Sequence, residues 1–572
     1  MDRDHAAMTS RNFAAQSYRG RFASGGWALP LPVLLLLAPF LIWPLGAILW
    51  HSFMPEGELS SSVLGEVFRD RFYWERLFFT ITQATASTIL ALAVGLPAAY
   101  VFSHLRFPGR ALARALITIP FVLPTLVAAL AFQQLFGQEG WFNTLLSFAN
   151  LGPVEPLGTI WLILVAHVFY NVAIVIRLVS GVWANLDPST EEAARLLGAG
   201  RIATLRTVTL PALTPAIAAA AALVFVFSFT SFGVVLILGG PGLDTLEVVI
   251  YRLTTRLVDL PAAAVLSLVQ IATTITALGG YSLIQRRSAR PLLRRSDRAR
   301  QWQETTLPER MLALAVAAVL SLLILTPLIT LVYSAFTLGA SDGITAANFE
   351  RLFQDTGRVS FIEPLNAIRW SLTFALAAAL LAVVVGALAA TAIAHSRGHL
   401  ATLADALLMV PLAVPAVVLG FGFLITFNDG LYDLRGSAWL IVIAHTLIAY
   451  PFVVRSVLAV LRTLDRQLIE AARVLGASPL DAWRHVELPL VWRALAIGAG
   501  FAFVISLGEF GATAVLQRRE FATLPVAIFT ALGRPGEVNL GQAIAMATLL
   551  MAITASGLLL IERFRYRDIG EF

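Results

Sequence analysis

The chain has 572 residues, of which 58% are hydrophobic and 13% charged, and its mean hydropathy is +0.79. This composition excludes a soluble globular protein of this size and indicates a polytopic membrane protein. The absence of Cys excludes disulfides and thiolate metal sites, and the absence of Lys excludes the phosphate-loop motif of an ATPase. The net charge of +6 comes from Arg residues between apolar stretches, so topology explains it better than a nucleic-acid partner.

Twelve apolar stretches are long enough to cross a bilayer, which takes about 20 residues. The first six lie at residues 27–50, 78–103, 115–137, 159–182, 213–237 and 262–285, and the other six at 311–337, 366–394, 404–428, 438–460, 491–516 and 541–562. We therefore predict an all-α polytopic membrane protein with two six-helix domains, 28–285 and 311–562. Residues 1–27, 286–310 and 563–572 are the predicted N-terminal segment, Arg-rich linker and C-terminal tail.

The placement of Arg residues predicts the orientation. Arg106, Arg110 and Arg114 follow the second span and share a side with the N-terminus. By the positive-inside rule this side is cytoplasmic, so both termini and the linker are expected there. The opposite loop, residues 138–158, contains no basic residue, and its apolar side chains predict a helix lying at the outer membrane surface.

One polar loop occurs twice. Residues 187–211 read DPSTEEAARLLGAGRIATLRTVTLP, and residues 465–489 repeat the pattern 278 positions later. The match extends over about ninety residues without a gap, so the chain is a tandem duplication. Because six spans separate equivalent positions, the halves have the same orientation. A parallel repeat predicts a pseudo-two-fold axis along the membrane normal, with a path between the halves.

Each copy of the loop has the features of a docking element. Asp187 and Asp465 can cap a helix, and Gly198 and Gly476 allow the left-handed turn that ends it. The following Leu-Pro is expected to restart a helix. For a single copy, an ordinary amphipathic helix facing water is the competing interpretation. The candidate docking residues are Glu192, Ala193, Ala194 and Gly198 with Glu470, Ala471, Ala472 and Gly476.

Two features of the spans point to a transport path. PFVLP, which ends at Pro124, and PLAVP, which ends at Pro415, interrupt the third span of each half. Broken helices persist in a membrane only where protein or water satisfies their backbone, so these breaks either line a cavity or are packed kinks. His167 and His445 occupy equivalent positions in the fourth spans, where we expect hydrogen-bonded packing residues.

The most informative difference between the halves lies in the fifth spans, where SFTSFG in the first half corresponds to SLGEFG in the second, so that Glu509 replaces Ser231. In a continuous helix Glu509 would lie roughly 10 Å inside the outer end. Ionisable groups at such depth are rare and tend to be functional. We expect Glu509 to line the path with Ser231, Phe232 and Phe510; alternatively, it pairs with an Arg or a backbone amide and holds the outer gate.

The repeated loop resembles a known signature. Its E-A-A, the Gly six residues after the Glu, and the Leu-Pro twelve residues beyond that Gly resemble the cytoplasmic loop of permease subunits of binding-protein-dependent ATP-binding-cassette (ABC) importers. SLGEFG followed by TLP, and AHVFYN in the first half, resemble the fused permeases of the thiamine and ferric-iron importers. The resemblance covers essentially the whole chain from the first span.

This resemblance implies a type I ABC importer fold in the bacterial inner membrane, surrounded by lipid. It implies a transport subunit without an ATPase site, bound cofactor or metal. Two cytoplasmic ATPase subunits, which hold ATP and Mg²⁺, would dock on the loops. A periplasmic or lipid-anchored binding protein would deliver a small cationic substrate of the ferric iron or thiamine and thiamine phosphate class.

Other functions remain open at this stage. A permease for a different small solute, such as a polyamine, sulfate or molybdate, would have the same loops. An ion-coupled secondary transporter would need several intramembrane carboxylates and inverted repeats, whereas the residues considered so far give Glu509 and parallel repeats. A scaffold or sensor would not need Pro-broken helices in both halves.

Overall fold

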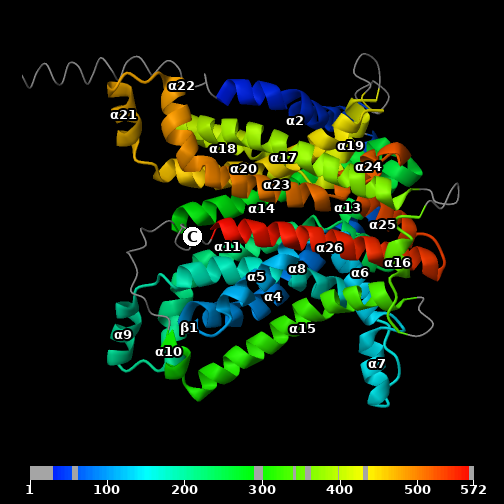
Figure 1. Ribbon diagram of the computed structural model, residues 1–572, viewed down its shortest axis with the longest axis horizontal. Helices are drawn as coiled ribbons and strands as arrows, with labels where there is room; N and C mark the ends of the chain where they lie inside the picture. Colours follow the sequence, from blue (N-terminus) through cyan, green and yellow to red (C-terminus); the bar gives the residue numbers. More distant parts are fainter. Residues whose placement is uncertain are drawn as a thin grey trace, which may run out of the picture.

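The computed structural model describes residues 30–54, 62–288, 300–338, 343–354, 362–396, 398–428, 434 and 436–565. Within these residues the fold is almost entirely helical, and its long helices run side by side between the two ends of the molecule (Figure 1). The strands in the described part are β1 (Leu105–Arg106) and β2 (Arg300–Gln301), which pair in parallel. This confirms the predicted all-α class.

The first half runs from α2 to α14. Its elements are α2 (Pro30–Phe53), α3 (Ser62–Arg69), α4 (Arg71–His104), α5 (Arg110–Val122), α6 (Thr125–Phe136), α7 (Trp141–Phe148), α8 (Ile160–Trp183), α9 (Pro188–Leu196), α10 (Arg201–Thr204), η1 (Leu205–Thr209), α11 (Leu210–Phe229), α12 (Gly233–Leu238), α13 (Leu246–Arg252), η2 (Leu253–Leu257) and α14 (Leu260–Ser288).

The second half begins after the short turn η3 (Trp302–Glu304). Its elements are α15 (Leu307–Thr337), α16 (Ala347–Glu350), α17 (Pro364–His395), α18 (Gly398–Leu408), η5 (Val410–Ala413), α19 (Ala416–Thr426), α20 (Ala438–Thr463), α21 (Arg466–Val474), α22 (Pro479–Ala482), η7 (Trp483–Glu487), α23 (Leu488–Gly508), α24 (Gly511–Leu516), η8 (Arg519–Phe521), α25 (Leu524–Leu532) and α26 (Glu537–Arg565).

Ten of the twelve predicted spans contain a single helix that is long and apolar enough to cross a membrane, counting only described residues. The third span of each half is broken, as its prolines predict. In the first half, segments Arg110–Val122 and Thr125–Phe148 differ in direction by 104°. In the second half, the 3₁₀ turn η5 separates α18 from α19. Both breaks end at a Pro, because Pro124 and Pro415 are the N-cap residues of α6 and α19, and a Pro lacks the N–H that a continuous helix would use.

The fifth spans are also broken, which corrects the prediction of continuous helices there. α11 ends at Phe229 and α23 at Gly508. The short helix α12 follows after three residues and α24 after two. The break in the second half falls at Glu509, which caps the end of α23 in an extended conformation. The depth derived from an unbroken helix therefore does not apply to Glu509.

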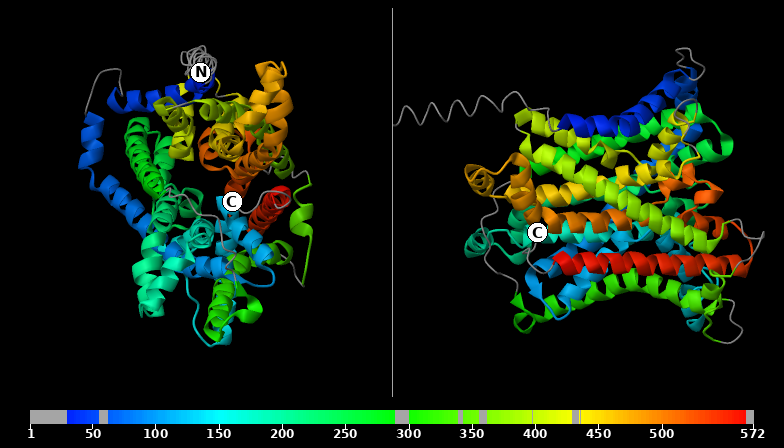
Figure 2. Two further views of the ribbon diagram at one scale, coloured as in Figure 1. Left: turned by 90° about the vertical axis from the view of Figure 1, so that its left-hand side faces the viewer. Right: turned by 45° about the horizontal axis from the view of Figure 1, so that its top comes forward.

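The duplication is visible in the helix bounds. Helices α9, α10 and α12 and the π-helical turn η1 recur 278 positions later, with the same lengths, as α21, α22, α24 and η7. The α9–α10 and α21–α22 loops project, apart from each other, from the same end of the molecule, where α26 also ends (Figure 1, Figure 2). This common end is what a parallel repeat requires, because equivalent segments of the two halves must face the same side.

The helix after each loop does not restart at its Pro, as the sequence suggested. α10, η1 and α11 form one continuous run, and α22, η7 and α23 form another. In each π-helical turn a backbone carbonyl accepts a hydrogen bond from the N–H five residues later in the chain. One example is the bond from the Leu210 N–H to the Leu205 carbonyl. A π turn shifts the hydrogen-bond register, so Pro211 and Pro489 fit within the run without ending it.

The first helix of each half packs mainly against helices that are distant from it in the sequence. α2 packs against α14 of its own half and against α19 and α17 of the second half. α15, which opens the second half, packs against α6, α4 and α5 of the first half as well as α26. The predicted domains 28–285 and 311–562 are therefore interleaved in space. The predicted linker 286–310 overlaps the ends of α14 and α15, and its residues 289–299 lie outside the described part.

Candidate functional site

Four aromatic side chains form a continuous row where the two halves meet. Tyr251 packs edge-on against Phe232 at 5.1 Å between ring centroids, Phe232 stacks on Phe510 at 5.3 Å with an angle of 22°, and Phe510 packs against Phe529 at 5.4 Å. The row is symmetric, because Phe232 and Phe510 are equivalent in the repeat, as are Tyr251 and Phe529. We call these four residues the aromatic row. Its central contact joins one half to the other.

The helix breaks beside the aromatic row are packed on one another without space for larger side chains. A Cβ atom on Gly508 would lie 3.0 Å from the Pro124 ring of the other half. A Cβ on Gly233 would lie 2.3 Å from the Thr125 hydroxyl oxygen, and one on Gly511 would lie 2.9 Å from the Cβ of Ala416. The broken third and fifth spans thus pack together next to Phe232 and Phe510.

All six predicted path residues are buried in this conformation: Glu509, Ser231, Phe232, Phe510, Pro124 and Pro415. The Phe232–Phe510 stack and the close approach of Gly508 to Pro124 lie at the contact between the halves. That these residues line a transport path stays a prediction. At this level the halves are in direct contact, so the breaks are packed here and the conformation described is closed at the aromatic row.

The Glu509 carboxylate is directed at its own half and is fully engaged. The backbone N–H groups of Ala512 and Thr513 donate to it at 2.8 and 3.1 Å, and the Thr513 hydroxyl donates at 2.5 Å. His445 Nε2 lies 3.2 Å from the same carboxylate. Glu509 therefore caps the N-terminus of α24, where the helix dipole favours a negative charge. Of the two roles considered from the sequence, these contacts match the one that holds the break together.

His445 links the carboxylate to the rest of the break. Its Nδ1 lies 2.8 Å from the Ser506 hydroxyl and its Nε2 lies 2.8 Å from the Thr513 hydroxyl. The network is complete when Nε2 carries the proton, Ser506 donates to Nδ1, and Thr513 donates to Glu509. In the first half, His167 Nδ1 contacts the Ser87 hydroxyl at 2.9 Å instead. Both histidines are buried and hydrogen-bonded, as expected of packing residues.

A second buried carboxylate, Glu247 in α13, was not singled out from the sequence. The Val417 backbone N–H in α19 donates to it at 3.3 Å, and the Gln270 side chain in α14 donates at 3.4 Å. Glu247 belongs to the first half and Val417 to the second, so this carboxylate caps a broken helix across the contact between the halves. Comparison of the two halves does not reveal Glu247 as a repeated residue, because its equivalent in the second half is Pro525.

The two repeated loops have the local geometry that the sequence predicted. Asp187 accepts from Ser189 N–H at 3.0 Å and Asp465 from Gln467 N–H at 2.9 Å, so both cap their helices. Gly198 and Gly476 have φ values of +92° and +91°. No heavy atom lies within 4 Å of a Cβ built on either Gly. The left-handed backbone, and not crowding, is what favours Gly at these positions.

Each loop presents an exposed apolar pair at its tip. Leu196 and Leu197 are each 89% exposed, and Val474 and Leu475 are 87% and 88% exposed. Exposed apolar side chains grouped in this way, at the same place in both halves, are typical of a contact surface for another protein. The predicted docking residues Glu192 and Glu470 are exposed on the same helices.

The second loop carries one residue with a shifted pKa. The Ser478 hydroxyl donates to the Asp481 carboxylate at 2.6 Å, and the Asp481 backbone N–H donates to the Ser478 hydroxyl at 3.2 Å. These hydrogen bonds hold the pKa of Asp481 below its usual range. Asp481 therefore stays charged at neutral pH at the start of α22.

The fold, the paired loops and the contact between the halves define a membrane transport subunit built from two parallel repeats. Residues 91–290 and 382–567 match the family model of the binding-protein-dependent transport system inner membrane component. The chain belongs to this family. It is therefore a permease subunit of a binding-protein-dependent ABC importer and a multi-pass membrane protein.

Three relatives match along nearly their whole length. The thiamine transport system permease protein ThiP of Escherichia coli is 28% identical over 89% of this chain and 91% of its own. ThiP of Brucella abortus (strain 2308) is 28% identical over 86% of this chain and 88% of its own. The probable ABC transporter permease protein y4fN of Sinorhizobium fredii is 27% identical over 92% of this chain and 94% of its own. A solved bacterial ABC transporter that imports alginate covers 47% of this chain with a TM-score of 0.40.

Proposed function

We propose that this permease carries a small organic cation of the thiamine class into the cytoplasm, along a path between its two halves. The aromatic row is the observation that carries the proposal, because it lies on the contact that such a path must cross. Phe232 and Phe510 would separate to admit the substrate and close behind it.

The chemistry of the site suits an aromatic cation. Aromatic faces attract quaternary nitrogen and stack on planar rings, and thiamine has both a cationic thiazolium ring and a pyrimidine ring. The buried side chains of Glu247 and Glu509 lie next to the aromatic row, and the Glu509 carboxylate, which accepts from two backbone N–H groups, gives this region negative charge. In the closed conformation both side chains cap helices, so Glu509 would act on a passing cation through its charge. The names of the thiamine permeases among the relatives support the same class.

Energy would come from two ATPase subunits that bind at the α9–α10 and α21–α22 loops. The exposed pairs Leu196–Leu197 and Val474–Leu475 would enter apolar pockets on those subunits. Each loop connects to the run that ends at a fifth-span break, through α11 or α23. A movement of the loops would therefore reach the aromatic row through one rigid helix in each half. In this proposal the loop end faces the cytoplasm, and both termini are expected on the same side.

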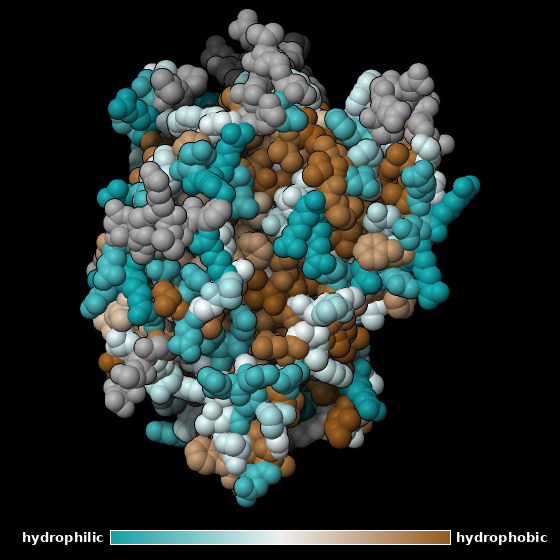
Figure 3. Space-filling model, turned by 90° about the vertical axis from the view of Figure 1, so that its right-hand side faces the viewer, coloured by the Kyte–Doolittle hydropathy of each residue, from teal (hydrophilic) through white to brown (hydrophobic). Residues whose placement is uncertain are grey.

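A binding protein would deliver the substrate at the opposite end. Figure 3 views that end and shows hydrophobic residues along its middle with hydrophilic residues on both sides. An apolar centre with a polar rim is the usual anatomy of a protein contact surface. Ferric iron remains the second candidate substrate. A hard cation of this kind favours oxygen ligands, whereas the aromatic row offers rings.

The test is uptake into proteoliposomes that contain this chain with its ATPase subunits and binding protein. Labelled thiamine, thiamine phosphate, ferric iron, putrescine and sulfate are supplied separately, with and without ATP. We expect ATP-dependent uptake of thiamine or its phosphate. ATP-dependent uptake of sulfate or iron in the absence of thiamine uptake would contradict the proposal.

A further inference from the structure

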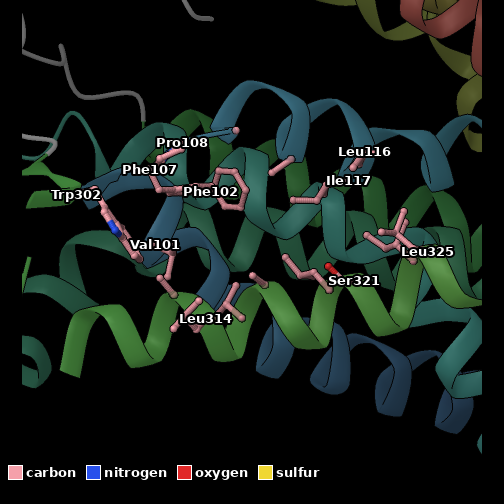
Figure 4. A pocket seen from close by; sticks show the side chains of 17 residues that line it. Val101, Phe102, Phe107, Pro108, Leu116, Ile117, Trp302, Leu314, Ser321 and Leu325 are labelled. Atoms are coloured by element: carbon pink, nitrogen blue, oxygen red, sulfur yellow. The ribbon is translucent and has the colours of Figure 1, made fainter. Parts of the chain in front are cut away.

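An apolar groove of about 490 Å³ lies on the side of the molecule, away from the aromatic row. Its walls are the end of α4, the segment from Phe107 to Ile117, and α15, so they come from both halves (Figure 4). The lining side chains are apolar except for the Ser321 hydroxyl and the Trp302 indole. The groove opens to the surface, because Leu314 and Ser321 are exposed.

The groove has the length of one leaflet. Its lining on α15 extends from Ala313 to Leu325. The twelve steps from Ala313 to Leu325 correspond to about 18 Å of helical rise. The hydrocarbon core of a bilayer is about 30 Å thick, so one leaflet contributes roughly 15 Å. The groove therefore fits one acyl chain from the headgroup level to the bilayer midplane.

One end of the groove is flanked by more Arg than Glu residues, with Glu304 and Glu309 on the same segments as Trp302 and Arg310. Arg110 donates through Nη2 to the carbonyl of the lining residue Phe102 at 2.6 Å. Arg310 donates through Nη2 to the carbonyl of Trp302 at 3.4 Å, and its guanidinium carbon lies 5.9 Å from the Trp302 ring. Both guanidinium groups are thus held beside lining residues. Arg106 and Arg114 are neighbours in the chain, and the nearby Glu309 accepts from the Thr306 N–H as part of a capping box.

The charged end is the end that a headgroup would occupy. β1 and the start of α15 lie towards the loop end of the molecule (Figure 1). Trp302 belongs to the same end, and Trp side chains are typical of the membrane–water interface. Arg residues at this level on the cytoplasmic side attract anionic phospholipids. The charged end therefore corresponds to the headgroup of a phospholipid, and the apolar groove corresponds to its acyl chain.

We propose that this groove is a binding site for one anionic phospholipid of the leaflet on the loop side. An acyl chain lies between α5 and α15, and the phosphate lies near Arg110 and Arg310. Because the walls belong to different halves, the lipid bridges them at a point distant from the substrate path.

Native mass spectrometry of the purified chain tests the site. The protein is extracted from vesicles with equal amounts of phosphatidylglycerol and phosphatidylethanolamine of the same acyl chains, and retained lipid is counted. The parent should retain one phosphatidylglycerol in preference to phosphatidylethanolamine. Ser321→Trp fills the groove and should lower the retained lipid about tenfold. Leu322→Trp is the matched control, because Leu322 is next to Ser321 on α15 but 69% exposed and absent from the lining.

A charge series tests the headgroup. Arg110→Gln with Arg310→Gln should remove the preference for phosphatidylglycerol, and Arg110→Lys with Arg310→Lys should restore most of it. Thermal melting of each variant shows whether it is folded, and photo-cross-linking from a diazirine acyl chain to α5 and α15 peptides provides a second measurement. Equal lipid retention by the Ser321→Trp and Leu322→Trp variants, or retention without preference by the parent, would overturn the proposal.

Discussion

Phe232 and Phe510, equivalent residues of the two halves, stack on each other with ring centroids 5.3 Å apart. A two-fold repeat brings equivalent residues into contact only at its axis, so this pair marks the pseudo-symmetry axis of the molecule. Tyr251 and Phe529 extend the contact on either side. The breaks in the third and fifth spans lie beside it, and the two buried carboxylates cap the helices that follow the two breaks of the second half. The contact between the halves is thus built from residues that the duplication supplied twice and then altered at single positions.

The first alteration is Glu509, and its coupling to His445 can be measured. Glu509→Gln keeps an acceptor for Ala512 and Thr513 but removes the charge beside His445, so we expect a loss of about 1–3 kcal/mol in stability and a several-fold lower uptake. Glu509→Asp keeps the charge and should retain more uptake. A double-mutant cycle with His445→Gln should give a coupling energy of about 0.5–3 kcal/mol. Additive effects would show that the two side chains act independently.

The second carboxylate, Glu247, should matter for the contact between the halves. Glu247→Ala leaves the buried Val417 N–H and Gln270 amide without this acceptor, which costs about 1–3 kcal/mol. Thermal unfolding should show a lower midpoint, and Glu247→Gln should recover part of it because its carbonyl oxygen still accepts from Val417. Glu139→Ala, at an exposed position, is the control and should leave the midpoint unchanged. An unaltered midpoint for Glu247→Ala would show that the cap across the halves contributes nothing.

The first loop should tolerate a substitution at Gly200 but not at Gly198, and the second loop should not tolerate one at Gly476. Gly198→Val and Gly476→Val force a β-branched residue into the left-handed region, which costs roughly 1–2 kcal/mol or more and distorts the turn. We expect the double variant to insert normally but to lose ATPase binding and uptake. Gly200→Ser is the matched control, because position 478 of the other loop is already Ser. Wild-type uptake by the double variant would exclude these turns from docking.

The topology follows from the same loops. Ser189→Cys in the first loop should react with an impermeant thiol reagent only after the cells are permeabilised. Ser147→Cys, in α7 at the opposite end, should react in intact cells. Both serines are exposed, and the chain has no other Cys. The reverse labelling pattern would place the loops outside the cell.

The sequence predicted most of the architecture because its signals are local or repeated. Apolar length locates the spans, prolines locate the breaks after α5 and α18, and the 278-residue offset locates both loops with their caps and left-handed glycines. The exchanged packing of α2 and α15 could not be predicted, because an apolar helix does not encode which neighbour buries it.

The site was predicted in part. Glu509, Phe232 and Phe510 were found by comparing the halves, and the structure brings them together. The break at Glu509 was missed, because it contains no Pro and depends on a carboxylate capping the next helix. Glu247 was missed for a different reason: its contact with Val417 joins residues 170 positions apart, and no local pattern indicates such a pair.

The most direct test of a path between the halves is to tie them together at the aromatic row. Phe232→Cys with Phe510→Cys is cross-linked with a short bis-methanethiosulfonate reagent, which forms a reducible disulfide with each Cys by displacing methanesulfinate. Thiamine uptake is measured before cross-linking, after it, and after reduction. The control pair, Phe510→Cys with Phe529→Cys, has a similar separation but joins two residues of the same half. The account predicts that the cross-half link stops uptake, that reduction restores it, and that the control link leaves most uptake intact. Full uptake through a completely cross-linked cross-half pair would contradict it.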